Sequence, residues 1–94
     1  MEIVWLDRAL DDIEAVVAYI ERENPPALRR MLSLIRRGVE QLTRFPDIGR
    51  PGRVVGTREM VIIGTPFIVP YRVKSDRVEI LAVMHGPRQW PPSF

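Results

Sequence analysis

The triplet Asn24-Pro25-Pro26 constrains the fold of this chain more than any other feature, because it separates two long amphipathic runs. Before it, apolar residues recur at steps of three and four positions, which is the helical period: Leu6, Leu10, Ile13, Val16, Val17 and Ile20. After it, the same period continues at Leu28, Met31, Leu32, Ile35, Val39 and Leu42. Proline cannot donate the amide that a continuing helix needs, yet it suits the first turn of a new helix. The sequence therefore predicts two antiparallel helices joined by a tight connection.

The segments on either side of this hairpin are predicted to contain strands. Residues 2–6 form a short apolar run before the first helix. Residues 45–56 hold too many prolines and glycines for regular structure, so we expect an ordered loop there. Three β-type runs follow near 57–63, 67–73 and 77–84, and the turns between them have hairpin lengths. An antiparallel meander is therefore expected in the second half of the chain.

Two of these runs carry features that restrict their place in the sheet. Pro70 interrupts the run at 67–73, and its missing N–H predicts either a bulge or an edge position. The run at 77–84 is largely apolar on both alternating faces, which is typical of a central strand covered on both sides. Together with the helices, these runs predict one α+β domain over residues 1–94. In this domain an N-terminal strand and a helical hairpin pack on a small antiparallel sheet, in the order β-α-α-β-β-β.

Composition excludes several classes of protein. Ninety-four residues suffice for a single core but not for an elaborate cofactor pocket, and we expect no cofactor. The chain has no cysteine, which removes disulfides and thiolate metal sites. His85 is the only histidine and has no metal-ligand spacing around it, so no metal site is expected. The sequence shows no signal segment and no apolar run near the roughly 20 residues of a membrane span, so we expect a soluble cytoplasmic protein.

Charge is distributed unevenly along the chain. Residues 1–24 hold seven acidic and two basic side chains, whereas residues 25–94 hold five acidic and twelve basic ones. The two parts therefore carry −5 and +7, although the net charge is only +2. All basic residues but one are arginines, whose planar fork pairs with carboxylate or phosphate at two points. One face is expected to attract an acidic partner or nucleic acid.

The last third of the chain is expected to form a small basic effector surface. Its β-type runs bring four candidate side chains to one compact area: Arg58, Arg72, His85 and Arg88. Arg58 and Arg72 also have a structural alternative, because either can pair with Glu59 or Glu79 across strands. His85 is the one side chain expected to titrate near neutrality, and a structural hydrogen-bonding role is favoured for it because no base or acid is evident nearby.

Several motifs resemble those of the RelE/ParE superfamily of bacterial toxins. The most specific are Pro-x-x-Gly-Arg at 46–50, Gly-Thr-Arg-Glu at 56–59 and His-Gly-x-Arg-x-Trp at 85–90. Shorter likenesses cover nearly the whole chain in the right order: Trp5-Leu6-Asp7, Ala18-Tyr19-Ile20 and Tyr71-Arg72-Val73. The resemblance implies the toxin of a type II toxin-antitoxin module, of the kind that stabilises a plasmid or chromosome. It also implies a cognate antitoxin that wraps the toxin in a hetero-oligomer and neutralises it.

The superfamily contains two activities. RelE-like members cut messenger RNA inside the ribosome, which requires an acid, a base and cations that stabilise the charged phosphorane. ParE-like members inhibit DNA gyrase and need only a complementary surface. In the RNA-cleaving branch an arginine usually precedes the middle-strand tyrosine, where this chain has Phe67 and Ile68. Tyr71-Arg72-Val73 and the 85–90 ending resemble the ParE branch, so gyrase inhibition by contact is favoured. A ribosome-dependent endoribonuclease is the alternative, and an inert toxin that still binds its antitoxin is a third reading.

Each activity assigns different residues. Contact with gyrase or the antitoxin is expected to involve four side chains: Arg58, Arg72, Arg88 and Trp90. Trp90 is either a packing residue or an aromatic anchor for a partner. RNA cleavage would instead involve Arg58, His85 and Arg88, with the ribosome and messenger RNA as partners. Whether the chain is an enzyme therefore depends on the branch to which it belongs.

Overall fold

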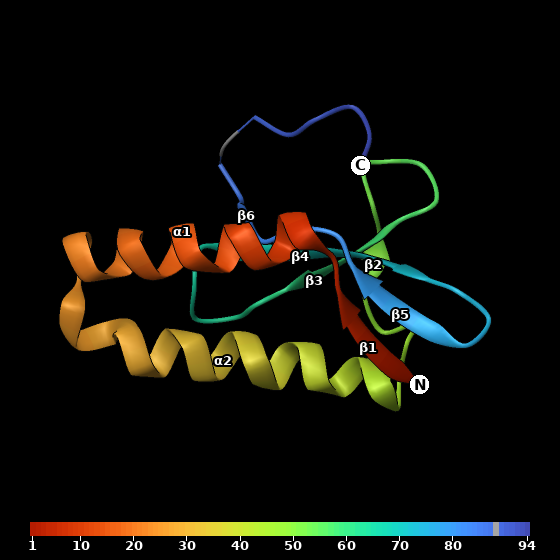
Figure 1. Ribbon diagram of the computed structural model, residues 1–94, viewed down its shortest axis with the longest axis horizontal. Helices are drawn as coiled ribbons and strands as arrows, with labels where there is room; N and C mark the ends of the chain where they lie inside the picture. The colour runs from red at the N-terminus through yellow and green to blue at the C-terminus, as the bar shows by residue number, and fades with distance from the viewer. Residues whose placement is uncertain (88) are drawn as a thin grey trace.

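Two long helices form one layer of the molecule and a β-sheet forms the other (Figure 1). The computed structural model describes residues 1–87 and 89–94. The helices are α1 (Asp7–Glu23) and α2 (Leu28–Glu40), joined by the 3₁₀ turn η1 (Pro25–Ala27). A second 3₁₀ turn, η2 (Gln41–Thr43), extends α2. The predicted helical hairpin is therefore confirmed, and its prolines occupy the first positions of η1.

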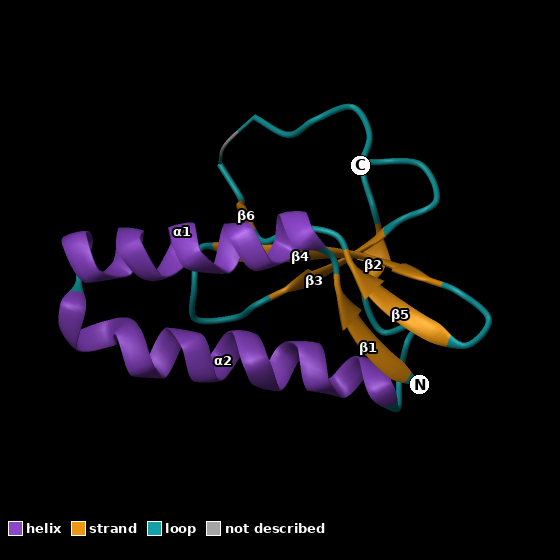
Figure 2. Ribbon diagram, in the orientation of Figure 1, coloured by secondary structure: helices purple, strands orange, loops and turns teal. Residues whose placement is uncertain are grey.

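The sheet is mixed and contains six strands (Figure 2). They are β1 (Glu2–Trp5), β2 (Arg50–Pro51), β3 (Arg58–Val61), β4 (Phe67–Val73), β5 (Arg77–Ile80) and β6 (Met84–His85). The main order is β1-β5-β4-β3-β2, and β6 pairs with β4. The predicted α+β fold and the β3-β4-β5 meander are confirmed. Two details of the sheet differ from the prediction. Strand β2 forms within the segment 45–56 that was expected to be a loop. In addition, β1 pairs with β5 in parallel, because the helical hairpin carries the chain over one face of the sheet between the first strand and the meander.

A bulge opposite Pro70, at residues 81–83, divides the last predicted strand into β5 and β6. Tyr71 of β4 faces Ile80, whereas Ile68 faces Met84, so three residues oppose the two between Ile68 and Tyr71. One extra residue on one strand is the mark of a bulge. Leu81 N donates to Pro70 O at 3.0 Å, and proline has no N–H to return that bond. The bulge expected from Pro70 is confirmed, and β5 lies centrally between β1 and β4 as expected.

The core lies between the helices and one face of the sheet. Its members come from α1, α2 and every strand from β3 to β5, and Val69, Tyr71 and Ile80 are fully buried there. Gly38 of α2 lies against the chain just after β3, where a Cβ atom would come within 2.6 Å of the Ile62 side chain. The helices therefore leave the opposite sheet face free to carry other groups.

Candidate arginine–glutamate interaction face

Charged side chains gather on the sheet face that points away from the helices. Successive strand residues alternate between faces, so Glu59 on β3 lies on the side opposite Met60. Cross-strand pairing places Arg72 of β4 opposite Glu79 of β5, and Arg50 of β2 opposite Glu59. We call this surface the arginine–glutamate face and define it by six residues: Arg50, Arg53, Glu59, Arg72, Arg77 and Glu79.

Glu59 is the centre of the first cluster on this face. Its side chain is only 2% exposed, and each carboxylate oxygen accepts from a different arginine. Arg50 donates to Oε1 through Nε at 3.0 Å and Nη2 at 2.9 Å. Arg53 donates to Oε2 through its backbone N at 2.8 Å and its Nε at 3.2 Å. Burial by itself would raise the pKa of Glu59, but these hydrogen bonds hold the pKa below its ordinary value.

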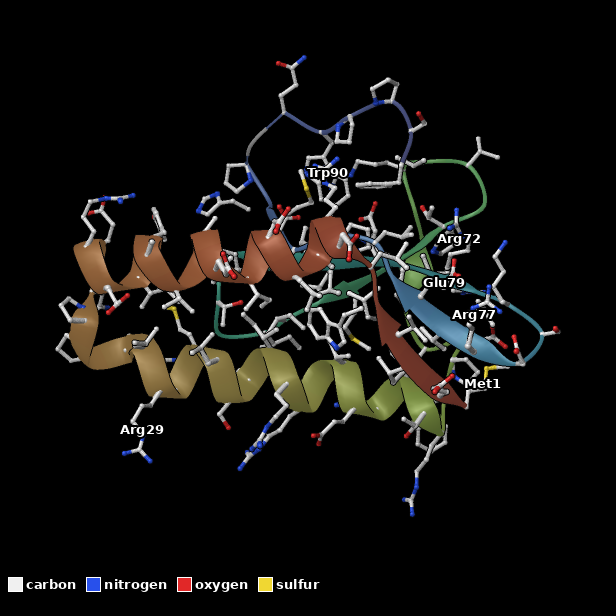
Figure 3. All side chains as sticks on the ribbon, viewed as in Figure 1. Met1, Arg29, Arg72, Arg77, Glu79 and Trp90 are labelled. Atoms are coloured by element: carbon white, nitrogen blue, oxygen red, sulfur yellow. The ribbon has the colours of Figure 1, made fainter. Side chains whose placement is uncertain are left out.

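Glu79 is the centre of the second cluster (Figure 3). Arg72 donates to its Oε1 through Nε at 3.1 Å and Nη2 at 2.8 Å. Arg77 donates to Oε2 through Nε at 3.0 Å, while its Nη1 reaches Asp76 at 2.8 Å. The bonds from Arg72 lower the pKa of Glu79, and the bond to Glu79 raises the pKa of Arg77. Of the two pairings expected for Arg72, the pairing with Glu79 is the one formed.

The two clusters have the same arrangement of charged side chains. Each nearly buried glutamate binds two arginines, so the six residues carry an excess of two positive charges. The arginine side chains remain between 34% and 51% exposed. Their carboxylate partners fix the direction of each guanidinium group while part of each group still faces solvent. This arrangement presents oriented cationic donors, which suit carboxylates or phosphates.

The C-terminal tail lies beside the first cluster. The Arg53 guanidinium stacks over the Trp90 ring, with Cζ 3.7 Å from the ring centroid. Trp90 is half-buried, and its Nε1 is buried without a hydrogen-bond partner among the described residues. Further along the tail, the Phe94 ring lies 5.2 Å from Cζ of Arg8 on α1. The tail therefore packs back on the domain, and Trp90 adjoins the arginine–glutamate face.

Arg58 lies at the start of β3, but it binds a loop and not a glutamate of the arginine–glutamate face. Its Nη1 donates to the carbonyls of Asp47 at 3.2 Å and Gly49 at 2.8 Å, and its Nε lies 3.6 Å from the Asp47 carboxylate. The Tyr71 hydroxyl holds the same loop, donating to Pro46 O at 2.7 Å and accepting from Gly49 N at 2.8 Å. Burial raises the pKa of this hydroxyl. Arg58 and Tyr71 therefore fasten the loop that the prolines and glycines predict, and Arg58 pairs with Asp47 instead of a strand glutamate.

His85 lies at the other end of β4. It is opposite Phe67, and its ring meets the edges of Tyr19 at 5.7 Å and Phe67 at 5.8 Å between centroids. Its Nδ1 is buried without a hydrogen-bond partner among the described residues. Arg58 is instead opposite Tyr71, four residues along β4, which is roughly 13 Å of strand. The structure therefore does not bring these two candidates together, and the third, Arg88, lies outside the described residues.

Comparison with known proteins identifies the family. The model of the ParE toxin of type II toxin-antitoxin systems, parDE, matches residues 3–90. The chain belongs to the ParE toxin family. Putative toxin Y4kP of Sinorhizobium fredii is 46% identical over 89 residues, covering 95% of this chain and 92% of that protein. Toxin RelE2 of Caulobacter vibrioides is 31% identical over 87 residues, covering 93% and 97%.

A solved structure supports the same assignment for the fold. A chain of the chromosomal ParDE TA system from P. aeruginosa matches with a TM-score of 0.69 and 26% identity, covering 90% of this chain and 95% of that chain. This chain is therefore the toxin component of a type II toxin-antitoxin module, and its family implies a cognate antitoxin. Among the described residues of this ParE toxin, no three His, Asp or Glu side chains are grouped to hold a metal ion. No described helix is both long enough and apolar enough to cross a membrane.

Three members of the face were missing from the sequence-based prediction of the ParE toxin site: Arg50, Arg53 and Arg77. Glu59 was expected as a partner of Arg58 or Arg72, but it binds Arg50 and Arg53 instead. Arg50 of β2 and Arg53 come from the segment 45–56, which the sequence predicts as an irregular loop and whose path it does not reveal. One signal was available, because Glu59 and Glu79 each sit inside an apolar strand, where a buried carboxylate requires a cationic partner. That signal indicates that partners exist, but it does not identify them.

Proposed function

We propose that this ParE toxin inhibits DNA gyrase in the cytoplasm by protein–protein contact through the arginine–glutamate face and the adjoining Trp90 tail. The observation that carries the proposal is that Arg72 and Arg50 are each held by a nearly buried glutamate while remaining about one-third to one-half exposed. A guanidinium group that is already oriented loses less conformational entropy on docking than a mobile one. The face is therefore suited to an acidic surface on its target.

The alternative activity, ribosome-dependent cleavage of messenger RNA, requires an assembled group of acid, base and cations. Arg58 is occupied by the loop carbonyls, and His85 packs between two aromatic rings at the far end of β4. Phe67 and Ile68 supply no cation at the position that the RNA-cleaving branch uses. These contacts favour inhibition by contact. The relative named RelE2 nevertheless makes the endoribonuclease the second candidate to be tested.

We further propose that the antitoxin contributes an acidic and apolar segment that lies along the helices and sheet. Apolar side chains of the sheet region need cover, since Val61 is 42% and Ile63 is 86% exposed. The arginine-rich part of the chain attracts carboxylates, so the affinity should fall as salt is added. A basic antitoxin segment whose affinity does not respond to salt would contradict this assignment.

Induced expression with separate readouts of DNA damage and translation tests the choice of target. We expect double-strand DNA breaks to rise before protein synthesis falls. Early cleavage of ribosome-bound messages with intact chromosomes would instead identify the endoribonuclease. If folded toxin accumulates and neither process changes, the chain is a toxin that has lost its potency.

Variants of the C-terminal end test the surface itself. Deletion of residues 90–94, or Arg88→Ala, should weaken toxicity far more than Arg29→Ala, because Trp90 is next to the face whereas Arg29 points from α2 into solvent (Figure 3). Thermal melts and soluble yield must accompany the assay, since Trp90 also packs on the domain. If the folded deletion variant remains fully toxic, the tail is not the effector surface and the helical hairpin becomes the better candidate.

A further inference from the structure

The outer side of α2 carries four arginines that are not part of the arginine–glutamate face. They form two adjacent pairs that are seven residues apart: Arg29 with Arg30, and Arg36 with Arg37. At about 100° per residue, both pairs fall on the side of the helix opposite the buried Ile35 and Val39. All four side chains are exposed, and Arg29 points away from the domain in Figure 3. This side of α2 therefore presents cations to solvent along its length.

The charges of these arginines are only weakly compensated. The helix contains one acidic residue, Glu40, and none in its first turn. Glu40 lies 4.0 Å from Arg36, and the two side chains are 66% and 72% exposed, so water screens this pair. Arg30 makes only a long hydrogen bond of 3.4 Å to the carbonyl of Gly64. With four arginines against one glutamate, α2 keeps a net charge of +3 over 13 residues, which creates a local positive field.

The arginines of α2 also lack the fixed direction of those on the arginine–glutamate face. A protein surface presents its carboxylates at particular places, and an oriented guanidinium group suits such a partner. A polyanion instead presents charge along its whole length. Binding that is driven by the release of counterions from a polyanion requires no fixed geometry of the cations. A row of mobile arginines is therefore better suited to a polyanion than to a single carboxylate.

Duplex DNA is the polyanion that fits this side of α2. All exposed residues of the helix are charged, so no exposed apolar side chain is present to enter a lipid surface. The helix has no aromatic residue, so it offers no stacking platform for the bases of a single strand. The two arginine pairs are separated by about 10.5 Å along the helix. Duplex DNA carries about six phosphates over that length, which is enough for all four arginines.

We propose that the outer side of α2 binds the phosphate backbone of duplex DNA without reading its sequence. Contacts to phosphates position a protein on DNA and carry no sequence information. The arginine–glutamate face lies on the side of the sheet that points away from the helices, so the toxin can contact DNA and a protein target at the same time (Figure 1). The inference does not depend on the gyrase proposal, because it concerns binding of DNA by the toxin alone.

The salt dependence of DNA binding tests the proposal. Full-length toxin is titrated into a short labelled duplex at several salt concentrations, and fluorescence anisotropy measures the association constant. No antitoxin is present, because an acidic segment over α2 would compete with DNA. The logarithm of the constant should fall with the logarithm of the salt concentration with a slope of about −3.6, since each of four phosphate contacts contributes about −0.9. Arg29→Ala/Arg37→Ala should bind about tenfold more weakly at low salt and reduce the slope to about −1.8.

A charge-matched variant separates a site on α2 from an effect of net charge. Arg22→Ala/Lys74→Ala also removes two exposed cations, one from α1 and one from the segment between β4 and β5. This variant should keep the wild-type slope, and thermal melts check that both double variants are folded. Equal losses in the two variants would mean that binding follows net charge alone. An unchanged slope in Arg29→Ala/Arg37→Ala would mean that DNA binds elsewhere on the toxin. Either result overturns the proposal.

Two further measurements distinguish the class of partner. Arg29→Lys/Arg37→Lys keeps both point charges and should bind the duplex within about twofold of the wild type, because attraction to phosphate does not need the guanidinium fork. Duplexes of different sequence should bind equally well. The same toxin is then tested with single-stranded RNA and with vesicles of phosphatidylserine and phosphatidylcholine. Tighter binding to either of these than to the duplex, or no binding to the duplex, overturns the proposal.

Discussion

The arginines of the sheet and those of the second helix behave as two different kinds of residue. The sheet set donates to carboxylates at 2.8–3.2 Å and consists of Arg50, Arg53, Arg72 and Arg77. The helix set is exposed and consists of Arg29, Arg30, Arg36 and Arg37. Its contacts are loose, at 4.0 Å from Arg36 to Glu40 and 3.4 Å from Arg30 to a carbonyl. The two sets differ because two nearly buried glutamates orient the guanidinium groups of the sheet set, whereas no buried carboxylate of the described residues orients those of the helix set.

Removing two arginines from each set should give the largest difference in stability between the sheet set and the helix set. The Arg50→Ala/Arg53→Ala double variant leaves the nearly buried Glu59 with only the backbone amide of residue 53, so we expect a loss of about 3 kcal/mol in the free energy of unfolding. The matched Arg29→Ala/Arg37→Ala variant should change it by less than about 0.5 kcal/mol. Urea unfolding measures both.

Adding Glu59→Gln to the first double variant provides an internal check. The triple variant no longer buries an unpaired carboxylate, so part of the lost stability should return. If the double variants of the two sets lose equal stability, the glutamates do not distinguish them and the comparison fails.

A second effect concerns the arginine that binds a loop instead of a glutamate. Arg58→Met removes the hydrogen bonds to the carbonyls of Asp47 and Gly49, so we expect a loss of about 1–2 kcal/mol. The backbone amide of Gly49 should exchange with solvent faster, because the loop is then held chiefly by Tyr71. Arg44→Met is the control, since Arg44 is exposed and borders the same loop. Equal exchange rates in the two variants would argue against a fastening role for Arg58.

Replacing one arginine of each set by lysine should give a smaller difference in stability between the sheet set and the helix set. Arg72→Lys keeps the positive charge but loses the fork that binds Glu79 through Nε and Nη2, so stability should fall by about 1 kcal/mol. Arg29→Lys should have no measurable effect, because a solvated cation does not require that geometry. Thermal or urea unfolding measures the difference. A similar loss at both positions would mean that the bidentate contact contributes nothing to stability.

The smallest effect is expected from acid. The pKa of Glu59 is lower in the folded chain than its ordinary value of 4.5, so its ionised form stabilises the fold above that value. This contribution is lost as the pH falls through the lowered folded pKa. When the pH falls from about 5 to about 3, the free energy of unfolding should decrease more for the wild type than for Glu59→Gln. Glu40→Gln, which alters the carboxylate paired with Arg36 of the helix set, should follow the wild type. Parallel curves for the wild type and Glu59→Gln would contradict the ionised pairing.

Much of the fold could be predicted from the sequence, because its signals are local. The apolar period and the Asn24-Pro25-Pro26 break predict the hairpin, and Pro70 predicts the bulge through its missing N–H. The pairing of Arg72 with Glu79 was also foreseeable as one of two alternatives, since a short turn joins their strands. The parallel pairing of β1 with β5 was not foreseen, because its partner lies more than 70 residues away and the N-terminal strand shows no turn signal that sets its register.

The candidate site was less predictable than the fold. Arg58 and Arg72 both seemed available to a strand glutamate, yet Arg58 turns to the 45–49 loop and Glu59 takes its arginines from residues 50 and 53. These choices depend on where an irregular loop returns to the sheet. Pro- and Gly-rich segments predict that the chain turns, but they do not predict the direction of the turn.

By itself, the sequence determined the helical hairpin and the strands of the meander, the excess of arginine in the second part of the chain, and the motifs that place it near the ParE toxins. Only the tertiary structure decided which arginines are oriented and which are solvated. The physical reason is that a guanidinium group acquires a fixed direction from a carboxylate partner. Each nearly buried glutamate receives both of its partners only after strand register and loop path are set. Local periodicity specifies neither of these.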